Sequence, residues 1–187
     1  FKASDLDDVI DTINATGYGL TFGLHTRIDD RVQTIIEKVQ AGNIYVNRDQ
    51  IGAVVGSQPF GGEGLSGTGP KAGGPHYLPR FAARPAPQAD GFWAGAADFK
   101  SLKTQLAEAT EPTITTPNDL PGPTGEANRH STHPRGPILC MGPGAKAAQD
   151  QMTAVTALGG IAVSTAGDLD PDKLIEMGPL GGVFWWG

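Results

Sequence analysis

The sequence predicts an α/β fold, because helical and strand-like segments alternate at both ends of the chain. Residues 4–47 have the pattern helix, strand, helix, strand. Residues 138–187 have the pattern strand, helix, strand, short helix, strand, which is typical of a Rossmann-like βαβ unit with a parallel sheet. The intervening residues are rich in glycine and proline, which indicates loops and a change of segment. We therefore expect two α/β units joined by a helix and a linker.

The first unit is expected to begin with a helix that Ser4 and Asp7 start in the manner of a capping box. Apolar residues then follow helical spacing, and Gly17 fits the C-terminal stop. A strand is expected over 20–26. A second helix, capped by Asp29 or Asp30, and a strand over 43–47 complete the pattern. The apolar positions of the two helices are assigned to the core: Leu6, Val9, Ile10, Ile13, Val32, Ile35, Ile36 and Val39.

A glycine-rich stretch, residues 52–81, follows the first unit and is expected to be an ordered loop. Its glycines alternate with apolar residues such as Val54, Phe60 and Leu65. Flexible linkers instead combine glycine with serine and other polar residues. The pattern indicates a backbone that approaches a ligand or a neighbouring chain closely, with positive φ angles that glycine adopts most readily.

The residues of this stretch resemble the aldehyde dehydrogenase superfamily, where the catalytic domain ends in a similar loop. The run GAVVGSQPFGG followed by GTGPKAGGPHYLPRF is similar to the glutamate-semialdehyde (Δ1-pyrroline-5-carboxylate) dehydrogenase branch. The run LPGPTGE at 120–126 resembles the bifunctional proline utilization A family. The resemblance extends over most of the chain, and it identifies the chain as a C-terminal portion of such a protein. The exposed apolar run at 183–186 likewise suggests a piece of a longer polypeptide.

The resemblance implies a role for three residues of the loop. Gly52 and Ala53 match the pair whose backbone N–H groups hold the substrate carboxylate, and consecutive N–H groups in a tight turn do form anion sites. Relatives often carry serine at the position of Ala53, so a hydroxyl contact is expected to be absent here. Phe60 matches the aromatic residue beside the aliphatic part of the substrate. Without the resemblance, Phe60 could equally be a core residue. Lys71 and His76 are expected to be structural or solvated.

We expect three segments along the chain. Residues 1–81 would form the C-terminal part of an aldehyde dehydrogenase catalytic domain with the substrate-anchor loop. Residues 82–137 would contain a helix at about 92–109 and a proline- and threonine-rich linker, or an extended strap, at 111–137. Residues 138–187 would begin a Rossmann-like domain related to aldehyde dehydrogenases. The resemblance implies that this last domain covers the catalytic module and has lost nucleotide binding.

Two tempting sites lie in the last segment. Gly142-Pro143-Gly144-Ala145-Lys146-Ala147 fits the pattern G-x-G-x-x-A between a strand and a helix, with Asp168 after the second strand. Pro143 removes one backbone donor, so a nucleotide site is the less favoured interpretation. Cys140 is the only cysteine and could suggest a nucleophile. It lies in an apolar strand without a nearby base, so we interpret it as structural. The resemblance places the nucleophile upstream of this chain, and we expect no metal site.

Composition excludes several classes of function. The formal net charge of −6 and the lack of a basic block argue against nucleic-acid binding. The apolar runs are too short to cross a bilayer. A single cysteine excludes an internal disulfide and fits a reducing cytosol, so a cytoplasmic location is expected. Peripheral membrane association is conceivable only for the longer parent polypeptide.

The predicted function is NAD-dependent oxidation of L-glutamate γ-semialdehyde to L-glutamate, as part of a bifunctional proline-catabolic enzyme. The resemblance implies NAD as cofactor, FAD on a proline dehydrogenase domain elsewhere in the parent, and channelling of the intermediate. Expected partners are the small-molecule substrate, the rest of the parent polypeptide and further copies in a homo-oligomer. Two alternatives remain open at this point: a monofunctional semialdehyde dehydrogenase, and a non-enzymatic nucleotide-binding module at 138–187.

Overall fold

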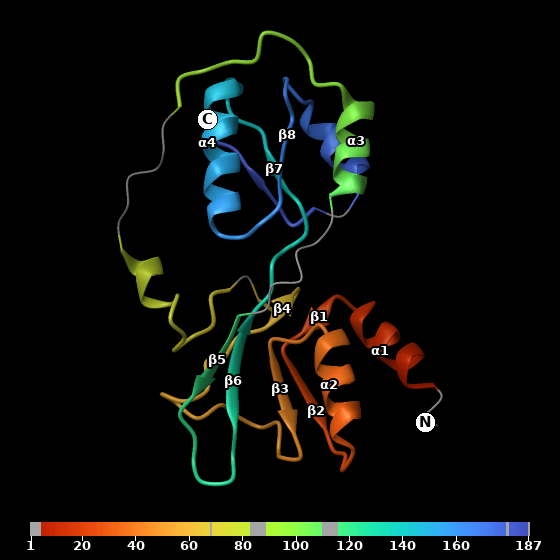
Figure 1. The fold of residues 1–187 in the computed structure, drawn as a ribbon, viewed down its shortest axis with the longest axis vertical. Helices are drawn as coiled ribbons and strands as arrows, with labels where there is room; N and C mark the ends of the chain where they lie inside the picture. Colours follow the sequence, from red (N-terminus) through yellow and green to blue (C-terminus); the bar gives the residue numbers. More distant parts are fainter. Residues whose placement is uncertain (1–4, 68, 83–88, 110–115, 179, 187) are drawn as a thin grey trace. The chain divides into compact units, whose positions relative to one another are not determined.

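The computed structural model describes residues 5–67, 69–82, 89–109, 116–178 and 180–186. They form two compact units. The first unit contains residues 1–83 and 119–130, and the second contains residues 84–118 and 131–187 (Figure 1). Both are α/β in character, so the predicted fold class is confirmed.

The first unit is built on a pair of parallel strands. Strand β2 (Thr21–Leu24) pairs with β3 (Asn43–Val46). Helices α1 (Leu6–Asn14) and α2 (Asp29–Lys38) pack on this pair and bury an apolar cluster formed by Ile10, Ile35 and Val39. The short strand β1 (Tyr18–Gly19) pairs antiparallel with β4 (Glu63–Gly64), so part of the glycine-rich stretch joins this unit as a strand.

The helices and strands expected at 4–47 are therefore confirmed, with two corrections. The strand expected at 20–26 is the shorter β2, and the two-residue strand β1 precedes it. The expected cap of α2 is wrong: its N-cap residue is Ile28, and Asp29 and Asp30 lie in the first turn, where their charges favour the positive end of the helix. The capping box expected at Ser4 lies outside the described residues.

The second unit has a three-stranded parallel sheet in the order β8-β7-β9. Its strands are β7 (Ile138–Cys140), β8 (Ala162–Ser164) and β9 (Gly182–Phe184). Helix α4 (Gly144–Ala157) connects β7 to β8, and the 3₁₀ helix η3 (Pro171–Met177) lies between β8 and β9. The first strand is central, and the later strands flank it on opposite sides, which is the arrangement of a doubly wound sheet.

Helices cover both faces of this sheet. Helix α4 lies on one side, and helix α3 (Phe99–Glu108) and η3 lie on the other (Figure 1). The main apolar cluster is formed between the sheet, α3 and η3 by Leu102, Leu139, Val163, Leu169 and Met177. Leu139 and Cys140 of the central strand are fully buried and Ile138 is half-buried, which explains why this run is apolar.

The region between the two α/β patterns differs from expectation. The helix expected at 92–109 begins at Phe99, because Asp98 accepts a hydrogen bond from the Ser101 N–H (3.1 Å) and caps the helix there. The linker expected at 111–137 includes strands β5 (Thr116–Leu120) and β6 (Asn128–Thr132), which form a hairpin. The hairpin loop belongs to the first unit. The short 3₁₀ helix η2 (Leu78–Phe81) ends the glycine-rich stretch.

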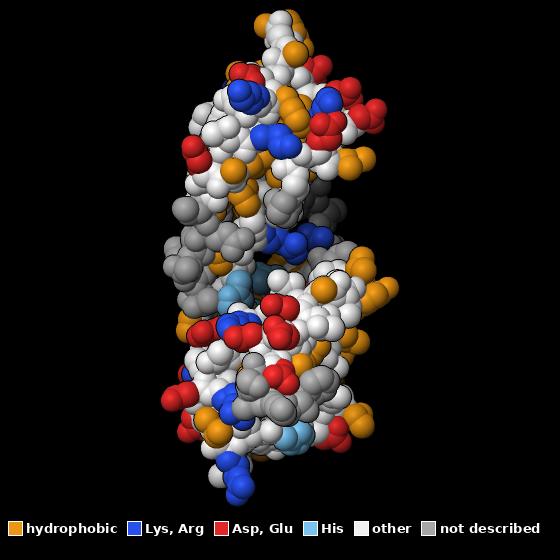
Figure 2. All heavy atoms as spheres, turned by 90° about the vertical axis from the view of Figure 1, so that its right-hand side faces the viewer, with side chains coloured by type: hydrophobic (Ala, Val, Ile, Leu, Met, Phe, Trp, Pro, Cys, Tyr) orange, Lys and Arg blue, Asp and Glu red, His pale blue; other side chains and the backbone are white. Residues whose placement is uncertain are grey.

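Both units leave large apolar side chains at the surface, including Val55, Leu78 and Phe81 in the first and Phe92, Leu158 and Ile175 in the second. Such side chains lie among acidic and basic ones on the face shown in Figure 2. Within the part of the chain that the structure describes, no helix combines the length and the hydropathy that a bilayer crossing requires.

Candidate substrate-anchor site

The backbone around Phe60 is fixed from both sides. The Phe60 N–H donates to Ala72 O (3.0 Å), and the Ala72 N–H donates to Phe60 O (2.8 Å). Asn43, the first residue of β3, donates from Nδ2 to Pro59 O (2.9 Å) and accepts from the Gly61 N–H (3.2 Å). Phe60 is half-buried and, among the described residues, belongs to neither buried apolar cluster. It is therefore held rigidly without being part of the core.

Lys71 supports the same loop from within. Its ammonium group donates to Gly61 O (2.7 Å) and Asn43 Oδ1 (3.3 Å), and it also contacts Gly42 O. Burial lowers the pKa of Lys71, and the Glu63 carboxylate acts in the opposite direction. The expectation that Lys71 is structural agrees with these contacts. His130 has a lowered pKa, caused first by burial and then by the charges of Lys71 and His76.

Gly52 and Ala53 lie between two short closed turns. On one side, the Ile51 N–H donates to Asp49 Oδ1 (3.0 Å). On the other, the Val54 N–H donates to Gln58 Oε1 (2.9 Å) and the Gln58 N–H donates back to Val54 O (2.9 Å). The flanking N–H groups are thus used internally, whereas those of Gly52 and Ala53 have no partner among the described residues. Gly52 has φ +77°, which favours glycine.

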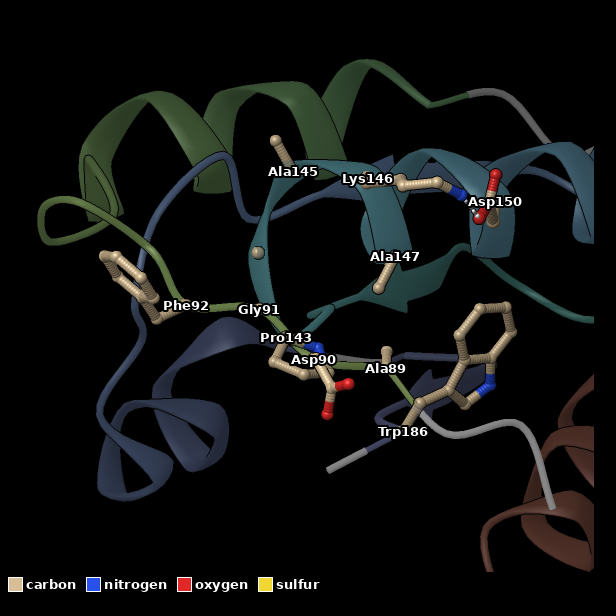
Figure 3. Close-up of a pocket in the computed structure, with 11 residues that line it drawn as sticks. Ala89, Asp90, Gly91, Phe92, Pro143, Ala145, Lys146, Ala147, Asp150 and Trp186 are labelled. Carbon is tan, nitrogen blue, oxygen red and sulfur yellow. Dashed lines mark hydrogen bonds and ion pairs between the residues drawn. The ribbon is translucent and has the colours of Figure 1, made fainter.

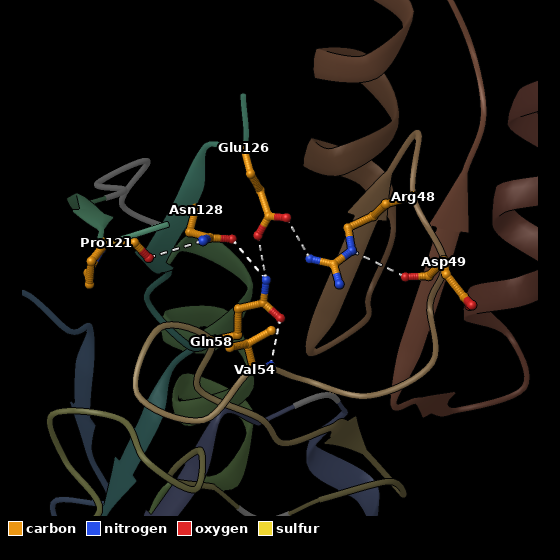
Figure 4. Close-up of polar contacts among 7 residues, drawn as sticks. All are labelled: Arg48, Asp49, Val54, Gln58, Pro121, Glu126 and Asn128. Carbon is orange, nitrogen blue, oxygen red and sulfur yellow. Dashed lines mark hydrogen bonds and ion pairs between the residues drawn. The ribbon is translucent and has the colours of Figure 1, made fainter. Parts of the chain in front are cut away.

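The side chain of Gln58 connects this loop to the hairpin. Its Nε2 donates to Glu126 Oε1 (2.8 Å) and to Asn128 Oδ1 (3.2 Å). Arg48 Nη1 lies 3.0 Å from Glu126 Oε2 and forms an ion pair with it. Figure 4 shows these side chains converging from the residues after β3, the glycine-rich loop and the hairpin.

Among the described residues, Gly52 and Ala53 therefore present two adjacent backbone N–H groups without a hydrogen-bond partner. Adjacent N–H groups of this kind suit a carboxylate, since each carboxylate oxygen accepts hydrogen bonds. Within the ranges that the structure describes, no group of three or more His, Cys, Asp or Glu side chains is placed to hold a metal ion.

The glycine turn of the second unit, residues 142–144, is in contact with other segments of the same unit. Both backbone polar groups of Gly142 bond to the amide of Gln151, and Trp93 Nε1 donates to Met141 O (2.8 Å). A Cβ atom on Gly144 would lie 3.0 Å from Phe92 O, and one on Gly91 would lie 2.8 Å from Pro143 O. These glycines permit close approach of two backbone segments, residues 91–92 and 142–144, rather than approach of a pyrophosphate.

The neighbouring surface is covered in the same way. The Ala97 N–H donates to Asp168 O (2.8 Å) and the Asp168 N–H donates to Gly95 O (2.9 Å), so residues 95–97 lie beside Asp168. A pocket of about 470 Å³ remains near the turn, and Trp186 lines part of it (Figure 3). Its cation, Lys146, is paired with Asp150 at 2.8 Å. The residues present therefore do not fit NAD at this turn.

Cys140 lies in the central strand β7 and is fully buried. Burial raises the pKa of its thiol to about 11. A thiol with this pKa is protonated near neutral pH and is a poor nucleophile. The interpretation of Cys140 as a structural residue agrees with this environment.

Comparison with known proteins agrees with the predicted resemblance. Residues 1–84 match the Aldehyde dehydrogenase family. The chain as a whole is similar to the bifunctional protein PutA of Rhizobium meliloti, with 42% identity over 184 residues, 90% of this chain and 15% of the relative. The chain thus spans about 15% of the length of this relative.

Two further relatives support the assignment. The 1-pyrroline-5-carboxylate dehydrogenase of Bacillus subtilis (strain 168) is 48% identical over 77 residues, 41% of this chain and 15% of the relative. The structure of proline utilization A (PutA) from Corynebacterium freiburgense matches with a TM-score of 0.50 and 26% identity, over 89% of this chain and 18% of that chain. The expected relationship to the proline utilization A proteins is therefore confirmed.

Sequence reasoning missed the residues that hold the loop: Asn43, Arg48, Gln58 and Glu126. Glu126 was part of a recognised run, but its contact with Gln58 joins residues 68 positions apart. No local sequence pattern predicts such a contact. The only indication in the sequence was the run LPGPTGE, to which no structural role had been assigned.

Proposed function

We propose that this chain is part of a bifunctional proline-catabolic enzyme that oxidises L-glutamate γ-semialdehyde to L-glutamate with NAD. The similarity to PutA proteins along 90% of the chain supports this proposal. The similarity of the first unit to 1-pyrroline-5-carboxylate dehydrogenases supports the semialdehyde as substrate. FAD would act on a proline dehydrogenase domain outside these 187 residues.

The observation that carries the proposal is the pair of N–H groups at Gly52 and Ala53, which have no hydrogen-bond partner in the described ranges. We infer that they bind the carboxylate of the semialdehyde, and that Phe60 lies along its aliphatic part. A carboxylate held by preorganised backbone donors fixes the distance from the anchor to the aldehyde carbon. The role of this chain is therefore to bind and orient the substrate.

The reacting groups would come from elsewhere in the parent polypeptide. Cys140 is protonated and buried, and the glycine turn of the second unit is covered by residues 91–93. We therefore assign the nucleophile, the general base and the NAD site to other segments. In the proposal, residues 82–137 connect the catalytic segment to a covering domain that begins at residue 138. The parent enzyme would be a cytoplasmic homo-oligomer.

The test is NADH formation by the parent enzyme with two aldehydes. Glutamate semialdehyde should be strongly preferred over pentanal, an uncharged aldehyde of similar length, and the preference should lie mainly in KM. Equal kcat/KM values for the two aldehydes would reject the carboxylate anchor and with it the assigned substrate.

A further inference from the structure

The hairpin loop that carries LPGPTGE is shaped to present Glu126. The Glu126 N–H donates to Pro123 O (3.1 Å), and Gly125 has φ +87°. Asn128 Nδ2 donates to Pro121 O (3.1 Å). A Cβ atom on Gly122 would lie 2.6 Å from Asn128 Nδ2, so a side chain there would displace this bond. Proline, glycine and asparagine thus hold the loop in one conformation.

Each oxygen of the Glu126 carboxylate has its own partner. Oε1 accepts from Gln58 Nε2 at 2.8 Å, and Oε2 lies 3.0 Å from Arg48 Nη1. The Glu126 and Arg48 side chains are 28% and 30% exposed, so this ion pair is shielded more than a surface pair. Arg48 also lies over the ring of Tyr45, with 5.3 Å between Cζ and the ring centroid. The carboxylate is therefore held by a side chain that is itself fixed on the first unit.

These contacts determine which way the Gln58 amide points. Glu126 and Asn128 both offer oxygen acceptors, so Nε2 faces the hairpin and Oε1 faces the Val54 N–H. A flipped amide would place Oε1 against two oxygens and Nε2 against a donor. The turn at 54–58 thus remains closed, and the N–H groups just before it remain available to an anion.

We propose that Glu126 is a positioning residue for the carboxylate anchor at Gly52 and Ala53, acting through Gln58. This inference rests on the proposed function and deepens it, because it gives the LPGPTGE run a task in substrate recognition. Glu126 does not touch the substrate. It sets the conformation of the loop that does, and its loss weakens binding of aldehydes that carry a carboxylate.

The experiment compares steady-state kinetics of the parent enzyme with glutamate semialdehyde and pentanal. Glu126→Ala should raise KM for the semialdehyde by about tenfold, the effect of losing a charge-assisted hydrogen bond of ordinary strength. Its kcat for the semialdehyde and both constants for pentanal should stay within about twofold of the wild type, because the aldehyde end is unaffected.

Three further variants make the result specific. Glu126→Gln keeps an acceptor for Gln58 Nε2 and should restore KM to within about threefold of the wild type. Gln58→Met removes both amide contacts and should raise KM as Glu126→Ala does, with no further rise in the double variant. Asp119→Ala removes the same charge from the same hairpin and is the matched control. The Asp119 side chain is 86% exposed, and its Oδ1 lies 3.5 Å from Arg129 Nε, so KM should not change for either aldehyde.

The outcomes separate this inference from the proposed function. A wild-type enzyme without preference for the semialdehyde would reject the anchor itself. If the wild type prefers the semialdehyde, an unchanged KM in Gln58→Met, or an equal rise with both aldehydes, would overturn the positioning role alone. Should Glu126→Ala not fold, Glu126→Gln and Gln58→Met still decide the matter.

Discussion

Gln151 holds Gly142 by both ends of its side-chain amide. The Gly142 N–H donates to Gln151 Oε1 (3.0 Å), and Gln151 Nε2 donates to Gly142 O (2.7 Å). Gln151 is fully buried in α4, so these bonds are shielded from solvent. A fully paired amide is the condition under which a buried glutamine is tolerated. The glycine turn after β7 is therefore closed by a residue of the following helix.

Replacing Gln151 with leucine should destabilise the second unit by about 2–4 kcal/mol, because the N–H and C=O of Gly142 lose their partners while remaining buried. All three tryptophans lie in this unit, so tryptophan fluorescence during urea unfolding reports its stability. Gln149→Leu, on the exposed side of the same helix, is the control and should have little effect. Equal losses for the two variants would contradict the role of Gln151.

A valine at Gly52 should raise KM for glutamate semialdehyde by at least about tenfold in the parent enzyme, since φ +77° strains any β-branched residue and the anchor loop must shift. KM for pentanal should change little. Gly73→Val is the matched control: Gly73 has φ +72° and, like Gly52, open space around its Cβ position. The anchor role requires that the control variant keep its preference for the semialdehyde.

Methionine at Lys71 should loosen the loop around Phe60, because three oxygen atoms lose their donor. Amide hydrogen exchange at Phe60 and Ala72 should accelerate by about tenfold or more, which corresponds to a local loss of about 1.4 kcal/mol or more. Lys38→Met removes a lysine from the exposed pair with Asp7 and should leave both amides unchanged. Unchanged amide exchange in Lys71→Met would show that the hydrogen bonds of the Lys71 ammonium group do not stabilise the loop.

The buried thiol of Cys140 should make the stability of the second unit fall at alkaline pH. Well below pH 9, the thiol is protonated in both the folded and the unfolded chain, and its full contribution to the free energy of unfolding is present. Between the ordinary thiol pKa of 9.0 and the folded pKa of about 11, the thiol ionises mainly in the unfolded chain, so the unfolding free energy decreases as pH rises. The loss should reach about 2–3 kcal/mol.

Comparison with Cys140→Ala isolates this effect, because other groups titrate in the same range in both proteins. The difference in unfolding free energy between wild type and variant should shrink from pH 9 to pH 11. A constant difference would contradict the raised pKa. In the parent enzyme, the same variant should retain nearly all turnover, whereas a large loss would refute the structural role of Cys140.

NAD should not bind this chain on its own, because the chain covers its glycine turn. Isothermal titration should give no heat up to about 1 mM NAD, and the chain should show no dehydrogenase turnover. Saturable binding would instead support a nucleotide-binding module in residues 138–187.

Much of the fold could be predicted because it depends on local patterns. Helical spacing of apolar residues located α1, α2 and α4, and short apolar runs located β3, β7 and β8. The start of α3 was misplaced because Phe92 and Trp93 suggested helix, whereas they belong to the segment that covers the glycine turn. The hairpin was missed because its strands, TPNDL and NRHST, show no apolar alternation.

The sequence by itself determined the α/β class, the family and the loop on which an anchor would lie. These follow from periodicity and from motifs that are continuous in the chain. Tertiary structure alone decided that Glu126, which is paired with Arg48, holds Gln58, and that residues 91–93 cover the glycine turn at 142–144. The physical reason is that hydrogen bonding and steric exclusion depend on atoms that folding brings together from distant positions, and these distances are not encoded in any local pattern.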